Sequence, residues 1–391
     1  MKKNYFMLAA TTMMLAACAQ TDVVNEIAVE ETPQAIGFET FANKQTRADD
    51  ETPAAATTAL ATHHDAYKVW AYKNTQNTTL VFNAEGVKAS DNSYSFTQYW
   101  DKAATNYYFY AAAPALAVTQ NGLTFTESKT GATTNQDAAY FMYTDLTLSG
   151  SNFSNLTNLR TDAQSTFIIK DNEGKQTITG TDVDYMIAKT PVARANGTYT
   201  NPVNFDFKHI LSRLNITIKA AASTPTIKLT NLSLHSLKNK ATFNSSMETF
   251  TSRWSSSATT AYNGYKVASN TGITVPTTAS YILECLLIPQ IAKYQSVALA
   301  GENSYDENAP YIHVQYMIDS EIFDAYYNLA ALFGATSDDT NTNDKKENEV
   351  TFSEACQSTL NITFNPTGIE FSTTTTNWGA ENTTTDDKTI D

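Results

Sequence analysis

Short apolar runs that alternate with polar residues recur along this chain, and they constrain its fold more than any other feature. Between residues 66 and 200 they are separated by clusters of Asn, Gly, Asp and Thr. Clear examples are 66–72 (AYKVWAY), 107–114 (YYFYAAAP) and 138–146 (AAYFMYTDL). Period-two alternation bounded by turn residues is typical of half-buried strands, and regularly spaced strands of this kind predict a β-sandwich.

The second half of the chain continues the pattern and carries few helix signals. Residues 203–219 hold two alternating sets, and HILSR between them resets the parity, which predicts a bulge or a single helical turn. Residues 321–334 (EIFDAYYNLAALFG) are the one good helix candidate. Charged residues make up only 17% of the chain, while Thr, Ser, Asn and aromatic residues are abundant. This balance suits strands and turns, so we predict an all-β fold with few short helices.

The length of 391 residues is enough for two domains, each with its own core. The segment 191–202 is bracketed by prolines and contains a glycine, which makes it the best candidate for a boundary. We therefore predict one β-sandwich domain over 48–198 and a second over 199–391, the latter ending in a strand and a polar tail.

The N-terminus has the features of a bacterial export signal. Lys2 and Lys3 precede a short apolar run that ends in LAAC, residues 15–18. Small residues before a cysteine match the lipobox, in which the thiol is diacylated and becomes the mature N-terminus. We predict a signal peptide over 1–17 and lipidation at Cys18. The alternative is an ordinary secretory signal that is cut after an A-x-A-like site.

A polar, acidic tether follows Cys18 and leads to one short strand. There Ile36 and Phe38 alternate with Gly37 and Glu39, which gives the strand one apolar face. Loose sequence surrounds Arg47, the first arginine of the chain, and the next arginine is Arg160. Composition alone assigns Arg47 no role in folding.

The sequence contains no strong signal for catalysis, a cofactor or a metal. A formal net charge of −14 without a basic stripe makes nucleic acid a poor partner. No phosphate-binding glycine loop, nucleophile elbow or CxxC motif occurs. His63, His64 and Asp65 fit a solvated loop, and the oxygen-rich segment 338–349 lacks the glycine and the final glutamate of an EF-hand. We therefore predict a protein that is not an enzyme, with no catalytic residues, no metal site and no cofactor.

Two cysteines remain after the lipobox. Cys285 and Cys356 both lie in strand-like contexts that suit small buried hydrophobic residues. A disulfide between them after export is the alternative, and the sequence leaves both possibilities open.

Six segments in order resemble the fimbrillin family of Bacteroidetes, whose members are subunits of type V pili and related surface adhesins. The segments are the lipobox, IGFETFANKQTRA, YWDKAATNYYFYAAAP, VNFDFKHILSRLNITI, LECLLIPQ and GIEFSTTTTNW. The resemblance covers nearly the whole chain. It implies two tandem transthyretin-like β-sandwich domains and export as an outer-membrane lipoprotein precursor that ends in a fimbrium at the cell surface.

The resemblance also gives Arg47 a role. It implies that an arginine-specific protease cuts between Arg47 and Ala48, and that subunits then assemble by strand exchange. Residues 18–47 would be a propeptide whose strand, with Ile36 and Phe38, plugs a groove. Once the plug leaves, the groove is an open sheet edge that accepts a strand from another subunit. The implied partners are other fimbrillin subunits, the protease and a host or bacterial surface ligand.

The C-terminus departs from a strong polymerising subunit. A donor strand should alternate apolar residues, and the candidates here are Ile369, Phe371 and Trp378, which are followed by a polar tail. A stalk, tip or anchor role therefore stays open. The alternative function is a monomeric surface lipoprotein that keeps residues 18–47 and binds glycans for nutrient uptake.

Overall fold

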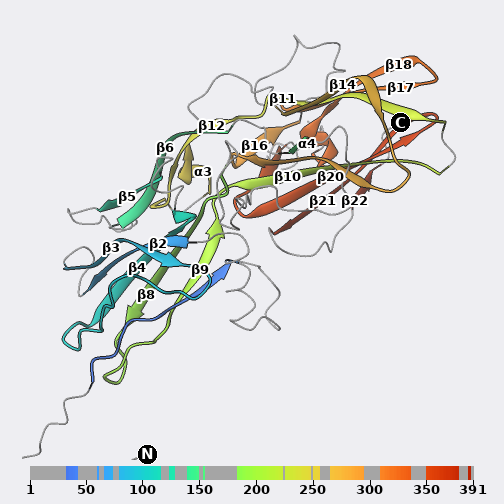
Figure 1. The fold of residues 1–391 in the computed structure, drawn as a ribbon. Coiled ribbons are helices and arrows are strands. Elements are labelled where there is room, and N and C mark those ends of the chain that lie inside the picture. Colours follow the sequence, from blue (N-terminus) through green and yellow to red (C-terminus); the bar gives the residue numbers. More distant parts are fainter. Residues whose placement is uncertain are drawn as a thin grey trace, which may run out of the picture. The chain divides into compact units, whose positions relative to one another are not determined.

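The structure of the protein is a computed structural model (Figure 1). It describes residues 32–42, 60, 66–73, 79–115, 123–127, 139–148, 153–154, 183–222, 225–247, 250–255, 265–294, 309–335, 349–377 and 386–388. From Ala35 onward these residues belong to one compact unit.

The N-terminal half of the unit is built on two sheets (Figure 1). The first sheet has the strand order β1-β9-β8-β4-β2-β3 and the second β13-β12-β6-β5. Their bounds are β1 Phe38–Ala42, β2 Ala66–Lys73, β3 Thr79–Lys88, β4 Asn106–Ala113, β5 Leu123–Glu127, β6 Ala139–Thr147, β8 Met186–Ala193, β9 Val203–His209, β12 Lys240–Asn244 and β13 Trp254–Ser255.

The C-terminal half is built on two further sheets and a short strand pair. The third sheet has the order β22-β21-β20-β10-β15-β7, the fourth β14-β11-β17-β18, and β16 pairs with β19. Their bounds are β7 Phe153–Ser154, β10 Ser212–Ala220, β11 Ile227–His235, β14 Tyr265–Thr274, β15 Ser280–Leu287, β16 Gln290–Lys293, β17 Tyr311–Ile318, β18 Glu321–Asn328, β19 Glu349–Phe352, β20 Cys356–Asn365, β21 Gly368–Asn377 and β22 Asp386–Lys388. Two helices of one turn are described, α3 Phe250–Arg253 and α4 Leu329–Leu332.

Hydrophobic clusters join these sheets in layers. One cluster lies between the third and fourth sheets. A second joins the first sheet to the second sheet. A third covers the opposite face of the first sheet. The predicted all-β sandwich is therefore confirmed, while the assignment of the sandwiches to the transthyretin-like fold stays a prediction.

Strand β9 shows how the sequence pattern produces this arrangement. Val203, Phe205 and Phe207 are fully buried in the cluster on one face of the first sheet, while the residues between them point to the other face. The strand ends at His209 and β10 begins at Ser212, so the chain changes sheets where HILSR resets the parity.

The strand pairing also crosses the predicted boundary at residue 198. Strand β9 belongs to the first sheet, β12 pairs with β6, and β7 pairs with β15. The chain thus passes from the first sheet to the third near residue 210. Strands β7 and β12 each pair with a strand from the other side of that point. Separate folding of the two predicted domains stays a prediction.

The predicted helix over 321–334 is wrong over most of its length. Residues 321–328 form β18, which pairs with β17 in unbroken register from Glu321 to Asn328. Only the one-turn α4 follows, and Asn328 caps it by accepting a hydrogen bond from the Ala331 amide at 2.9 Å. The aromatic residues of this segment suit either structure, and pairing with β17 decides between them.

The cysteines and the C-terminal hairpin follow the sequence more closely. No disulfide joins Cys285, which is buried in the core, to Cys356. Strands β20 and β21 meet at a tight turn over Pro366 and Thr367, as the Pro-Thr-Gly sequence predicts.

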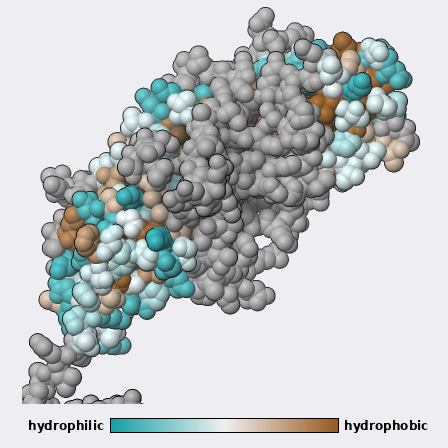
Figure 2. Space-filling view, in the orientation of Figure 1, coloured by the Kyte–Doolittle hydropathy of each residue, from teal (hydrophilic) through white to brown (hydrophobic). Residues whose placement is uncertain are grey.

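The described surface has few large apolar patches. In the view of Figure 2, hydrophobic residues form small separate patches among hydrophilic ones. The large hydrophobic side chains that are exposed in the described part are Leu80, Phe96, Tyr99 and Ile322. Among the described residues, no helix is long and apolar enough to cross a membrane.

Candidate functional site

The N-terminal segment 35–42, called the docked segment here, lies at the edge of the first sheet. Its strand β1 is the last strand of that sheet and runs parallel to β9, with Phe38 opposite Val203 and Thr40 opposite Phe205. On its other side Ala35 forms an antiparallel bridge with Tyr99. The docked segment therefore has partners on both sides, from parts of the chain far away in sequence.

Main-chain groups of the docked segment are held at four points. The Ile36 amide donates to the Gln98 carbonyl, and the Val203 amide donates to the Gly37 carbonyl, each at 2.8 Å. The Gly37 amide donates to Asn201 Oδ1 at 2.7 Å, and Asn201 Nδ2 donates to the Ala35 carbonyl at 3.2 Å. These contacts hold a backbone and do not depend on its side chains.

Tyr94 adds a side-chain anchor on the same stretch. Its hydroxyl donates to the Ile36 carbonyl at 2.6 Å. Burial raises the pKa of Tyr94 above its ordinary value, which already lies well above physiological pH, so the hydroxyl is a protonated donor.

Two apolar side chains of the docked segment are buried, as the sequence predicts. Ile36 is 1% and Phe38 6% exposed, and both belong to the cluster on one face of the first sheet. The Phe38 ring lies among four other rings with centroid distances of 5.3 to 6.1 Å, those of Phe82, Tyr94, Phe109 and Phe205. Aromatic contacts at these distances make Phe38 the main apolar anchor of the segment.

Thr40 completes the buried face. It is fully buried, and its hydroxyl lies 3.5 Å from Asn92 Oδ1, which also accepts a 2.9 Å hydrogen bond from the Tyr67 hydroxyl. Burial raises the pKa of Tyr67 further above physiological pH. The buried face of the docked segment therefore has the spacing Ile-x-Phe-x-Thr.

Aromatic packing positions Asn201. The Trp100 indole donates to Asn201 Oδ1 at 3.3 Å, and its ring stacks on Tyr199 at 4.4 Å. The Tyr199 hydroxyl in turn donates to the Asp101 carbonyl at 2.8 Å. Asn201 is thus held by its surroundings and presents its amide to the docked segment.

The other predicted site residues that are described do not lie beside the docked segment. Ile369 and Phe371 lie in β21, where both are buried in the core between the third and fourth sheets. Strand β21 is paired with β20 along its length and with β22 over Phe371, Ser372 and Thr373. Cys18, Arg47, Ala48 and Trp378 lie outside the described residues.

Sequence patterns do not identify the residues that hold the docked segment. Asn201 falls in the segment that the sequence assigns to a boundary loop, and Tyr94 lies in a stretch without periodicity. One weak signal points to this place. The YWDKAATNYYFYAAAP segment, which is part of the family resemblance, begins with Tyr99 and Trp100. Tyr99 forms the bridge with Ala35, and Trp100 donates to Asn201. Among the described residues no group of three His, Cys, Asp or Glu side chains is placed to hold a metal ion.

The sequence model of the fimbrillin-like family matches residues 157–378. A comparison with curated proteins finds no match.

Several solved structures resemble this chain at low identity. A candidate cell adhesion protein from Bacteroides uniformis is 14% identical, with 88% of this chain and 99% of that chain covered and a TM-score of 0.41. One from Bacteroides eggerthii is 11% identical, with 88% and 96% covered and a TM-score of 0.43. The tip fimbrial protein Mfa3 from Porphyromonas gingivalis, with a C-terminal truncation, is 10% identical, with 81% and 95% covered and a TM-score of 0.40.

Proposed function

The chain belongs to the fimbrillin-like family, and on that premise we propose that it is a structural subunit of a cell-surface fimbria or adhesin. Its proposed partners are other fimbrillin subunits, joined by strand exchange, and a host or bacterial surface ligand. This function needs no catalytic group.

The docked segment is the observation that carries the proposal. It is an edge strand whose backbone is held by Asn201, Gln98 and Tyr94, and whose side chains Ile36 and Phe38 fill apolar space. Arg47 follows only five residues after the end of β1. A cut between Arg47 and Ala48 by an arginine-specific protease would detach the segment from the rest of the chain. The segment could then leave, and an open groove would remain.

Such a groove would select its next occupant in two ways. The main-chain contacts give affinity for any extended backbone that runs parallel to β9, and the buried positions select an apolar residue, an aromatic ring and a small polar residue at alternate sites. Burial of an Ile or Phe side chain contributes roughly 1.5 to 3 kcal/mol. A polar strand of the same length would therefore bind much more weakly.

Strand β21 carries the same spacing as the docked segment. Ile369, Phe371 and Thr373 repeat the order of Ile36, Phe38 and Thr40, and all three are buried in their own sheet. Glu370 would take the place of Gly37, where a Cβ would lie 3.5 Å from Asn201 Oδ1, an ordinary contact. Donation by a folded copy would cost the pairing of β21 with β20, so this exchange would be slow.

Export as a lipoprotein is the remaining part of the proposal. The LAAC sequence before residue 19 supports lipidation at Cys18 and anchoring of the precursor in the outer membrane. Mass spectrometry of the unprocessed surface protein should find a diacylated Cys18 at its N-terminus. An unmodified N-terminus at another residue would contradict lipidation and favour an ordinary secretory signal.

Peptide exchange tests the proposed groove directly. Protein that has been cut after Arg47 should bind a fluorescent peptide of residues 34–42, and uncut protein should not, because its groove is filled. The matched control is the same peptide with Phe38→Asp, which we expect to bind at least about tenfold more weakly, since a carboxylate replaces a buried ring.

A second peptide, residues 367–375, tests the β21 match. Binding that competes with the 34–42 peptide would support β21 as the donor strand. If only the 367–375 peptide fails to bind, β21 is excluded as the donor and the proposed groove is not contradicted. Equal binding of the wild-type and Phe38→Asp peptides to cut protein would show that strand exchange at this groove is wrong.

A further inference from the structure

The pairing of β1 with β9 places Asn201 at a special position. Strand β9 begins at Val203, whose partner in β1 is Phe38. Counting back two residues along both parallel strands brings Ile36 opposite Asn201. Asn201 therefore lies where the ladder between the two strands would continue, just before β9 begins.

A parallel ladder has a regular hydrogen-bond pattern. A residue that bonds to the partner strand donates its N–H to the carbonyl before its partner, and its own carbonyl accepts from the amide after that partner. Val203 follows this pattern, since its amide donates to the Gly37 carbonyl at 2.8 Å. The same pattern opposite Ile36 requires a donor to the Ala35 carbonyl and an acceptor for the Gly37 amide.

The side chain of Asn201 makes both of these bonds. Its Nδ2 donates to the Ala35 carbonyl at 3.2 Å, and its Oδ1 accepts from the Gly37 amide at 2.7 Å. An asparagine side chain ends in an amide, so it offers the same kinds of donor and acceptor as the main chain. The side chain thus takes the place of main chain at the end of the ladder.

The neighbours of Asn201 determine which way its amide points. The Trp100 indole can only donate, so the atom that it faces at 3.3 Å is the oxygen Oδ1. The Ala35 carbonyl can only accept, so the atom beside it is the nitrogen. The stacking of Trp100 on Tyr199 holds the indole in place.

The other edge of the same stretch is also held. The Ile36 amide donates to the Gln98 carbonyl, and the Ile36 carbonyl accepts from the Tyr94 hydroxyl. The main-chain polar groups from the Ala35 carbonyl to the Gly37 carbonyl are therefore all hydrogen-bonded. A strand displaced by one residue would turn these groups to the wrong sides, because their direction alternates along a strand.

We propose that Asn201 sets the register of the strand that lies beside β9 and requires a free N–H at the position of Gly37. Every residue except proline supplies this N–H. A Cβ at this position would lie 3.5 Å from Asn201 Oδ1, an ordinary contact. Asn201 therefore selects for the main chain and leaves the choice of side chain open. The selection of an incoming strand rests on the proposed function, whereas the role of Asn201 in the uncut chain does not.

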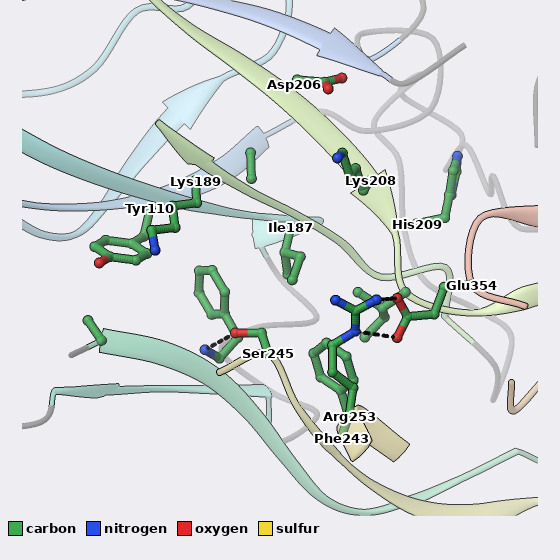
Figure 3. A pocket seen from close by; sticks show the side chains of 14 residues that line it. Tyr110, Ile187, Lys189, Asp206, Lys208, His209, Phe243, Ser245, Arg253 and Glu354 are labelled. Atoms are coloured by element: carbon green, nitrogen blue, oxygen red, sulfur yellow. Dashed lines mark hydrogen bonds and ion pairs between the residues drawn. The ribbon is translucent and has the colours of Figure 1, made fainter. Parts of the chain in front are cut away.

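Asn204 provides a matched control on the same strand. The residues between the buried positions of β9 point to the other face of the sheet, where Asp206 and Lys208 line a cavity (Figure 3). Asn204 shares this face and is exposed, and it lies opposite Glu39 of β1. Alanine at 204 therefore removes an asparagine side chain next to β1 without removing a bond of the ladder.

Hydrogen exchange of the Gly37 amide in the uncut full chain tests the role of Asn201. The chain is labelled with 15N-glycine, and the Gly37 signal is the one that is missing from Gly37→Ala. Asn201→Ala should speed exchange of this amide at least about tenfold, because its acceptor is removed. Asn201→Asp should stay within about threefold of wild type, since a carboxylate oxygen still accepts. Asn201 is exposed, so both variants should fold.

The control Asn204→Ala should exchange like wild type. The proposal is overturned if the Gly37 amide of Asn201→Ala exchanges at the wild-type rate, or if Asn201→Asp exchanges as fast as Asn201→Ala. It is also overturned if Asn204→Ala speeds exchange as much as Asn201→Ala, because the effect would then be a general loosening of the strand.

Peptide binding tests the requirement for a free N–H. Cut wild-type protein should bind the 34–42 peptide with Gly37→Ala at least about tenfold more tightly than the peptide with Gly37→Pro, which lacks the donor. In cut Asn201→Ala protein this difference should shrink, since the side-chain acceptor is gone. An equal difference in the two proteins would overturn the requirement. If no peptide binds to cut protein, strand exchange beside β9 is wrong, and the exchange rates of the uncut chain still decide the role of Asn201.

Discussion

Replacing Arg47 by lysine is expected to abolish assembly that depends on an arginine-specific protease. Wild-type protein treated with such a protease should form SDS-resistant ladders and fibres visible by electron microscopy. The Arg47→Lys protein, treated in the same way, should remain monomeric. The substitution keeps the positive charge and removes only the arginine side chain that the protease recognises before the cleaved bond. The docked segment therefore stays joined to the chain and continues to fill the groove.

A matched control tests whether cleavage at Arg47, and not at another arginine, is required for assembly. Arg160→Lys, at the next arginine in the sequence, should assemble like wild type. If Arg47→Lys assembles as well as wild type, or if cut protein stays monomeric at every concentration, strand exchange at this site is wrong. The monomeric glycan-binding lipoprotein would then be the better interpretation.

Replacing Phe38 by alanine should lower the free energy of unfolding of the uncut protein by about 3 to 5 kcal/mol, as for other buried aromatic residues. Phe38 is 6% exposed and contacts the rings of Phe82, Tyr94, Phe109 and Phe205. Alanine would leave a cavity among rigid rings that cannot collapse easily. Urea unfolding followed by tryptophan fluorescence measures the effect.

Tryptophan fluorescence is a suitable probe because Trp70, Trp100 and Trp254 all pack into clusters of the first and second sheets. Phe96→Ala is the matched control, since Phe96 is 74% exposed on the loop beside the groove. This variant should change stability by no more than about 0.5 kcal/mol. Equal stability of the two variants would mean that the docked segment is not held by its aromatic anchor, which would contradict the energetic basis of the groove.

The fold shows which structural features local sequence can predict. The alternation in β9 and the turn between β20 and β21 depend on residues close together in the chain, and the structure confirms both. The sequence of 321–328 wrongly predicts a helix, because its aromatic residues are compatible with either structure. Pairing with β17 makes it a strand, and a single segment contains no information about that partner.

The candidate functional site likewise contains some residues that local sequence predicts and others that it does not. Period-two alternation identifies Ile36 and Phe38, and both are buried. Asn201, which holds the backbone beside them, is 166 residues from Ala35, and its own segment predicts only a loop.

The sequence by itself determined the all-β class, the apolar face of the docked segment and the resemblance to fimbrillins. These depend on spacing within short segments, because alternation at two residues places side chains on one face of any strand. Only the tertiary structure decided which strands share a sheet and which groups bind the backbone of residues 35–37. The physical reason is that these features arise from contacts between segments far apart in the chain, whose packing is a property of the whole fold.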